Sequence, residues 1–396
     1  MHVSFIATAS TLALALSASL PAHAQAAPTE LYIDVATHTM PGMPGMGAMG
    51  RLAGAMGGQR PAYGMTRHPG MPGRYMDVAL HNRNAPGQSA TQAVPKGLQL
   101  GNRIELLPRE RSQGETGGSH DASGSLGLAD GGSYRIRYFW GCGEQVRGRQ
   151  PVEYSMTIRD GKPVQGGRAM APRPVPEQGP DVGPQHVLWP NPGARRAVSD
   201  KASLVGSHQL EGDGLPGAMQ FALGQADDFL PRLELDSSGS PGEGMTLEWT
   251  PVDGARGYFI HAMASQGDTI VMWSSSEDGY AGPELMDYLP ESLLAQWTGK
   301  RTVLGADARS CRIPTEAFAG VDAAPMVQMI AYGSQRSIAQ PRPADAVRDW
   351  SPAWTVRVRS KSTAMLVPGM AGATRDAAKP AARESARGLL RGLLGN

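Results

Sequence analysis

The strongest indication of fold in this chain is the stretch Leu247-Glu248-Trp249-Thr250-Pro251-Val252-Asp253-Gly254-Ala255-Arg256-Gly257-Tyr258-Phe259-Ile260. Two short runs of strand-forming residues flank a turn that contains Pro251 and Gly254. The composition of the whole chain agrees with a β structure. Its 51 Gly and 32 Pro among 396 residues favour turns and loops over long helices.

The same stretch resembles the B strand, turn and C strand of a fibronectin type III module. In that family a Trp on strand B and a Tyr on strand C pack into the core, and Trp249 and Tyr258 occupy those positions. The resemblance covers about residues 230–362. It implies further strands, which are A (Leu230–Leu235), C′ (Thr269–Ser274), E (Ser310–Pro314), F (Met326–Tyr332) and G (Trp354–Arg359). Residues 283–298 (PELMDYLPESLLAQWT) read as helical and depart from the family's strand order.

Working outward, the sequence predicts a mostly β protein with two β-sandwich-like domains. Alternating apolar residues at Ser133–Trp140 and Val152–Ile158 predict strands of a first β domain over residues 76–170. Residues 171–200 are rich in Pro and predict a linker. The fibronectin type III-like domain then covers residues 201–365, with the helical insertion at 283–298.

The amino-terminal residues predict export. Ile6–Leu20 is an apolar run of the length of a signal-peptide core and too short to span a bilayer. It is followed by Ala22-His23-Ala24, which predicts a signal peptide over residues 1–24 and cleavage before Gln25. No Cys lies directly after the cleavage site, which argues against a lipid anchor, so we expect a periplasmic or secreted protein. The alternative is a buried amino-terminal strand or helix.

Two cysteines, Cys142 and Cys311, are present in the whole chain. In an oxidising compartment an isolated pair is compatible with a disulfide. The alternative is two buried free thiols. The sequence leaves both readings open, because it does not give the distance between the two Cα atoms.

Residues 25–75 combine a short strand at Leu31–Val35 with a Met-, Gly- and Pro-rich segment from Thr39 to Tyr75. Such a composition buries too little apolar surface to order itself, so we expect a flexible insertion. Thioether and imidazole groups suit copper. The candidate ligands are Met40, Met43, Met46, Met49, His38 and His68. Alternatively, the methionines are the apolar filler of a low-complexity linker.

The carboxyl-terminal residues 366–396 predict a disordered or helical tail. Leu389, Leu390, Leu393 and Leu394 fall on one helical face beside a row of arginines. This tail is a candidate for contact with a membrane surface or an envelope protein. The alternative is a frayed end, since Gly388 and Gly392 weaken a helix.

The charge balance and the absence of catalytic motifs limit the classes of function to be considered. A formal net charge of +1 gives no basic excess, so nucleic-acid binding is not expected. The usual signatures of hydrolases, metalloproteases and nucleotide-binding loops are missing, so no catalytic residue and no cofactor are assigned. We therefore expect a non-catalytic exported protein that binds a partner or belongs to an envelope assembly. The alternatives are copper handling through residues 38–76 and an envelope enzyme with its site near residues 283–298.

Overall fold

Strands dominate the structure, and α2 (Glu291–Gly299) is the one α-helix within the described part of the chain. The computed structural model describes residues 27–41, 61–67, 71–109, 132–160, 162–167, 175, 179–217, 219–279 and 281–368. The prediction of a mostly β protein is confirmed.

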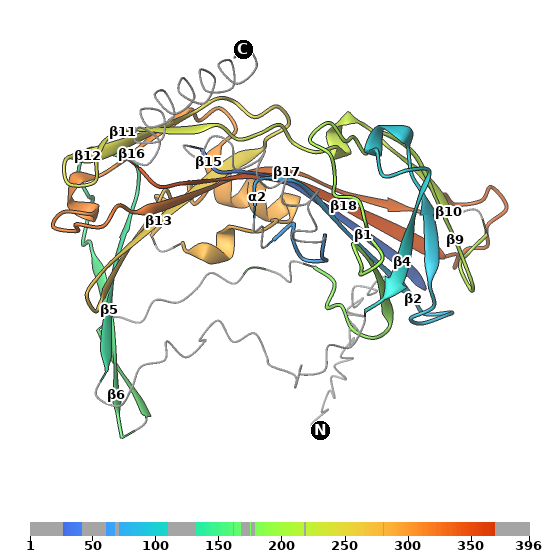
Figure 1. Cartoon of the computed structure of the whole chain (residues 1–396), viewed down its shortest axis with the longest axis horizontal. Helices are drawn as coiled ribbons and strands as arrows, with labels where there is room; N and C mark the ends of the chain where they lie inside the picture. The colour runs from blue at the N-terminus through green and yellow to red at the C-terminus, as the bar shows by residue number, and fades with distance from the viewer. Residues whose placement is uncertain are drawn as a thin grey trace, which may run out of the picture.

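One large mixed sheet runs through the molecule as an arch (Figure 1). Across the sheet the strands are β10 (Met219–Leu223), β9 (Gly206–Gly212), β3 (Ala90–Ala93), β4 (Arg103–Pro108), β8 (His186–Trp189), β2 (Gly73–Asn82), β1 (Thr29–Thr39), β18 (Trp354–Leu366), β17 (Met326–Ala339), β13 (Gly257–Gln266), β14 (Thr269–Ser274), β5 (Ser133–Trp140), β6 (Val152–Arg159) and β7 (Lys162–Gly167). A fifteenth strand, β15 (Leu304–Gly305), pairs with β13. Neighbouring strands are antiparallel except for two parallel pairs, β1 with β18 and β14 with β5.

A second sheet contains three antiparallel strands in the order β11 (Leu235–Ser240), β12 (Gly244–Trp249) and β16 (Ser310–Ile313). The strand predicted at Leu230–Leu235 is therefore wrong over most of its length, because β11 begins only at Leu235. The segment before it is held differently, because the Leu230 and Leu233 carbonyls accept hydrogen bonds from the Thr37 and Thr39 hydroxyls, each at 2.7 Å. Pro231 also lacks the N–H that a paired strand needs.

Three apolar clusters form the core. The first joins β1, β2 and β18 to β3, β4, β9 and β10. The second lies between the three-stranded sheet and the strands β13, β14 and β17. The third packs α2 and the short 3-10 helix η3 (Pro283–Leu285) against Phe259, Ile330 and Tyr332 on the other face of the large sheet.

β18 connects the first two clusters. Its residues Val356 and Val358 belong to the first cluster, and Ala364 and Leu366 belong to the second. β17 and β18 are both longer than the strands predicted at Met326–Tyr332 and Trp354–Arg359. Their pairing shifts register between Tyr332 and Gln335, as at a β-bulge.

Several local predictions can be placed on this fold. β5 coincides with the predicted strand Ser133–Trp140, and β6 extends the predicted Val152–Ile158 by one residue. The predicted linker 171–200 contains β8, which pairs with β2 and β4, so part of this range is a sheet strand. The predicted helix 283–298 consists of η3 and α2, and Pro290 lies between them as the N-cap of α2. The sheet continues without a break across strands from both predicted domains.

Candidate functional site

The central strands β2, β1 and β18 have one apolar face and one charged face. Successive side chains of a strand point to opposite faces, and Ile33, Val35, Val356 and Val358 all lie in the first apolar cluster. Asp34, between Ile33 and Val35, and Arg359, next to Val358, therefore lie on the opposite face. The registers place Asp34 beside Arg359 of β18 and Asp77 of β2.

Five charged side chains on this face form what we call the buried charge network: Asp34, Arg67, Asp287, Arg359 and Lys361. Arg359 donates two hydrogen bonds to Asp34, from Nε at 2.8 Å and from Nη2 at 2.5 Å. Lys361 Nζ lies 2.8 Å from Asp287 Oδ1. Arg67 joins the two pairs, with its Nε 2.8 Å from Asp287 Oδ2 and its Nη2 3.4 Å from Asp34 Oδ2.

Burial and the ionic partners act in opposite directions on the pKa values of Asp287, Arg359 and Lys361. Burial raises the pKa of Asp287, but Lys361 and Arg67 outweigh burial and hold that pKa below its usual value. Burial lowers the pKa of Arg359, and Asp34 outweighs burial, so the net pKa is raised. For Lys361, burial dominates over Asp287 and the pKa is lowered. The network therefore consists of three cations and two anions that pair with one another. Asp34, Arg359 and Lys361 are buried, whereas the Arg67 and Asp287 side chains are 24% and 22% exposed.

Tyr288, in the segment between η3 and α2, covers this network. Its hydroxyl donates to the Val35 carbonyl at 3.0 Å. The Arg359 guanidinium carbon and the Lys361 Nζ each lie 4.4 Å from the centre of its ring. Burial raises the pKa of Tyr288 well above its usual value. These contacts hold the segment between η3 and α2 on the sheet.

Asp77 and His38 attach the turn at residues 64–67 to the sheet. Asp77 accepts hydrogen bonds from the Gly64 and Thr66 amides, at 2.9 and 3.1 Å, and from the Thr66 hydroxyl. Burial raises the pKa of Asp77 to about 6. His38 bonds to the Thr363 hydroxyl at 2.5 Å and to the Thr66 carbonyl at 3.1 Å. Burial, and then Lys361, lower the pKa of His38 to about 3.

This arrangement bears on the copper ligands predicted from the sequence. Both ring nitrogens of His38 already have hydrogen-bonding partners, and the side chain is 5% exposed. Met40 directly follows the last residue of β1. The other predicted ligands, Met43, Met46, Met49 and His68, lie outside the described residues. Of this set the structure therefore places only His38 and Met40.

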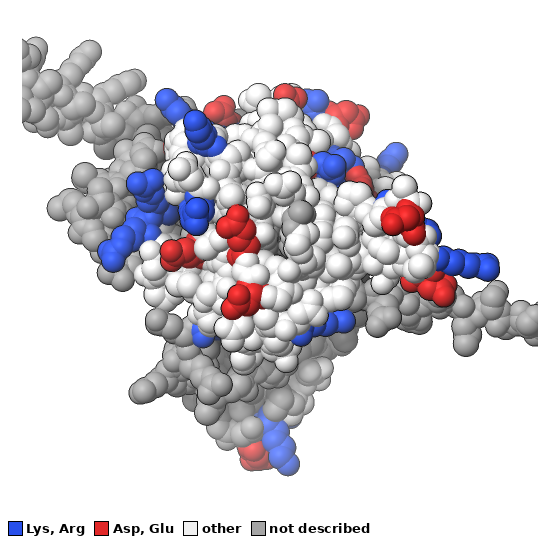
Figure 2. Space-filling view, turned by 90° about the vertical axis from the view of Figure 1, so that its right-hand side faces the viewer, with Lys and Arg blue, Asp and Glu red and all other residues white. Residues whose placement is uncertain are grey.

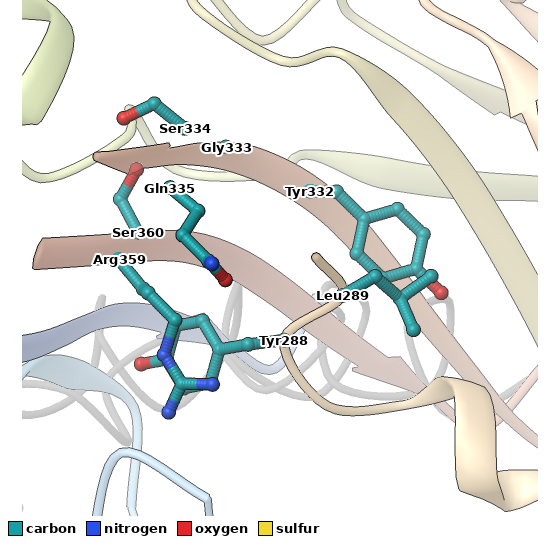
Figure 3. Close-up of a pocket in the computed structure, with 8 residues that line it drawn as sticks. All are labelled: Tyr288, Leu289, Tyr332, Gly333, Ser334, Gln335, Arg359 and Ser360. Atoms are coloured by element: carbon teal, nitrogen blue, oxygen red, sulfur yellow. The ribbon is translucent and has the colours of Figure 1, made fainter. Parts of the chain in front are cut away.

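A small depression lies beside the network (Figure 3). It is lined by Tyr288, Leu289, Tyr332, Gly333, Ser334, Gln335, Arg359 and Ser360. Gly333 lies at the register shift of β17, and a Cβ at this position would come 2.7 Å from the Ser360 carbonyl oxygen. The lining side chains fill the depression so closely that no water molecule fits inside it.

The predicted core pair and the two cysteines lie close to the second apolar cluster. Trp249 and Tyr258 are 5% and 0% exposed, and their ring centres are 5.5 Å apart. The Tyr258 hydroxyl accepts a hydrogen bond from the Val252 amide at 3.1 Å. Cys142 and Cys311 form a disulfide, with their Cα atoms 5.2 Å apart. It joins the end of β5 to β16, and therefore connects the two sheets.

Sequence reasoning did not find the buried charge network, because its members are spread from residue 34 to residue 361. One signal was available. Asp34 interrupts the apolar strand Leu31–Val35, and Arg357, Arg359 and Lys361 alternate with Val356 and Val358. Charged residues at alternate positions of an apolar strand are either exposed to solvent or paired with opposite charges.

Within the described ranges, no group of three or more His, Cys, Asp or Glu side chains is placed to hold a metal ion. None of the described helices is long and apolar enough to cross a membrane. On the face at the β9–β10 end, charged groups of both signs are scattered among uncharged residues (Figure 2). No protein-family model matches the chain, and neither the search of curated proteins nor that of solved structures gives a match.

Proposed function

We propose that this is an exported, non-catalytic β protein that acts by binding a partner or as part of an envelope assembly. The observation that carries this proposal is the structural role of the buried charge network. Its charges pair with one another and attach two segments to the sheet, and the adjacent depression has no room for a substrate. Charged side chains with this role stabilise the fold and do not act as general acids or bases.

We further propose that residues 230–362 form a fibronectin type III-like module. The pairing orders support it, since β11, β12 and β16 correspond to strands A, B and E, while β14, β13, β17 and β18 correspond to C′, C, F and G. Two-sheet modules of this kind separate an A, B and E group from a C, F and G group. The contact between Trp249 and Tyr258 is a second support.

The arm formed by β5, β6 and β7 supports a binding role. It projects from the body of the molecule (Figure 1). One face of it carries the half-buried Tyr134, Ile136, Tyr154 and Met156, and the other carries charged residues of β5 and β6. A projecting apolar face suits a partner protein with an uncharged contact surface.

Export is supported by the apolar run Ile6–Leu20 and by the disulfide, since disulfides persist in oxidising compartments. Expression of the full chain in a bacterial host tests it. We expect periplasmic protein that begins at Gln25, and an uncleaved precursor when Ala24 is replaced by Arg. Uncleaved wild-type protein in the cytoplasm contradicts export.

The binding role is tested by native separation of envelope extracts. We expect a complex that Tyr154→Asp disrupts. The matched variant Thr157→Asp, on the opposite face of the same strand, should leave the complex intact. Equal behaviour of the two variants contradicts a role for the arm. A turnover on ester, peptide, glycoside or phosphate substrates that Asp287→Asn abolishes would overturn the non-catalytic assignment.

A further inference from the structure

Three methionines lie in one row across the large sheet, on the face that also carries α2. The registers place Met263 of β13 opposite Met272 of β14 and opposite Met326 of β17. The face is fixed by alternation, because the neighbouring residues Ala262, Val271 and Val327 point into the second apolar cluster on the other side. Directly opposed side chains on adjacent antiparallel strands have Cβ atoms about 5 Å apart, so the three thioethers can approach one another.

His261 lies on the same face, two residues before Met263. It is 1% exposed, and neither ring nitrogen has a hydrogen-bonding partner in the described chain. The register partner of His261 on β14 is Ser274, whose hydroxyl is hydrogen-bonded to the Tyr138 hydroxyl at 2.6 Å. The register partner of His261 on β17 is the half-buried Gln328. Phe259, two residues earlier on β13, belongs to the third apolar cluster. A buried imidazole with no partner is unfavourable, and such a group requires an explanation.

The chemistry of these four side chains selects the ligand. Thioether sulfur is a soft donor that favours Cu(I), and imidazole nitrogen also binds copper. Ca²⁺ and Mg²⁺ need several oxygen ligands, which these four side chains do not supply. Methionine side chains are flexible and can turn toward a bound ion without moving the strands. The half-buried position of all three methionines provides access from one side of the sheet.

We propose that His261, Met263, Met272 and Met326 form a Cu(I) site on the face of β14, β13 and β17. An imidazole nitrogen of His261 supplies one ligand, and the thioether sulfurs supply the others. The site differs from the copper ligands predicted at residues 38–76 and shares no residue with them. It does not depend on the proposed binding role of the arm.

The site is tested by anaerobic titration of the full mature chain with Cu(I) in competition with a chromophoric Cu(I) chelator. X-ray absorption at the copper edge then identifies the ligand atoms. We expect one bound ion with sulfur and nitrogen ligands. Replacing Met263, Met272 and Met326 by Leu should weaken binding by about 100-fold or more, since loss of even supporting groups weakens metal sites by about 10- to 100-fold.

Met-to-Leu changes preserve volume, so the variant should fold, and circular dichroism checks this. Met329→Leu is the matched control, because Met329 lies on β17 but points into the opposite core. It should bind Cu(I) as the wild type does. His261→Phe should also weaken binding and lose the nitrogen ligand. The proposal is wrong if the triple variant binds as tightly as wild type, if no Cu(I) binds, or if binding depends instead on Met40, Met43, Met46 and Met49.

Discussion

Arg359 and Asp34 form the central ion pair of the buried charge network, with side chains 3% and 5% exposed. Arg359→Met leaves the Asp34 carboxylate buried, with the more distant Arg67 as its remaining ion-pair partner. Removing one partner of a buried pair costs about 3–5 kcal/mol, so we expect the free energy of unfolding in urea to fall by that amount. The double variant Asp34→Leu/Arg359→Met should lose less, because no charge remains unpaired.

A matched surface variant separates this effect from a general loss of an arginine. Arg301 pairs with Glu277 at 3.2 Å, but its side chain is 77% exposed. Arg301→Met should therefore change stability by no more than about 0.5 kcal/mol. If Arg359→Met and Arg301→Met have equal effects, the Asp34–Arg359 pair does not have the role assigned to it.

Asp77 gives the molecule a dependence on pH. Its pKa is raised by burial to about 6, so between about pH 4 and 6 the folded protein holds a proton that the unfolded chain has released. This contribution to stability is complete at low pH and is lost as the pH rises through 6. Relative to Asp77→Asn, wild-type protein should lose roughly 3 kcal/mol over this range, measured by urea unfolding at each pH.

Thr66 provides an independent check on Asp77. Its hydroxyl and amide donate to the carboxylate and lower the pKa against the effect of burial. Thr66→Val removes the hydroxyl bond, so the loss of stability should extend to higher pH than in wild type. An unchanged pH profile in Thr66→Val would show that another group controls it.

At the scale of elements, the bulge of β17 depends on Gly333. A Cβ there would come within 2.7 Å of the Ser360 carbonyl oxygen and still closer to the Ser360 hydroxyl. Gly333→Ala should therefore force β17 and β18 apart and cost about 1–3 kcal/mol, as overpacking does. Gly183→Ala is the control, because nothing lies within 4 Å of its added Cβ. Equal thermal midpoints for the two variants would contradict the close contact.

At the scale of the whole molecule, β18 contributes side chains to both of the main apolar clusters, so we expect the two clusters to unfold together. We expect a single urea transition, with coincident curves from circular dichroism and tryptophan fluorescence. Leu31→Ala acts in the first cluster and Leu247→Ala in the second. Each should shift the whole curve and cost about 2–5 kcal/mol. Two separate transitions, each sensitive to one variant only, would show that β18 does not couple the clusters.

The sequence by itself determined the local elements. Alternation of apolar residues predicted β5 and most of β6, and the strand–turn–strand stretch predicted β12 and β13. The resemblance to a fibronectin type III module implied the contact between Trp249 and Tyr258. The predictions of β5 and β6 succeed because a half-buried strand requires apolar residues at every second position. The helical reading of residues 283–298 was similarly local, and the structure has η3 and α2 there.

Only the tertiary structure decided which distant strands meet. The parallel pairing of β1 with β18 joins residues more than 300 positions apart and brings Asp34 to Arg359. The row of Met272, Met263 and Met326 likewise depends on register across three strands. Side-chain periodicity gives the face of each residue within its own strand. It does not give the partner strand or the register, which depend on how all the apolar faces are buried together.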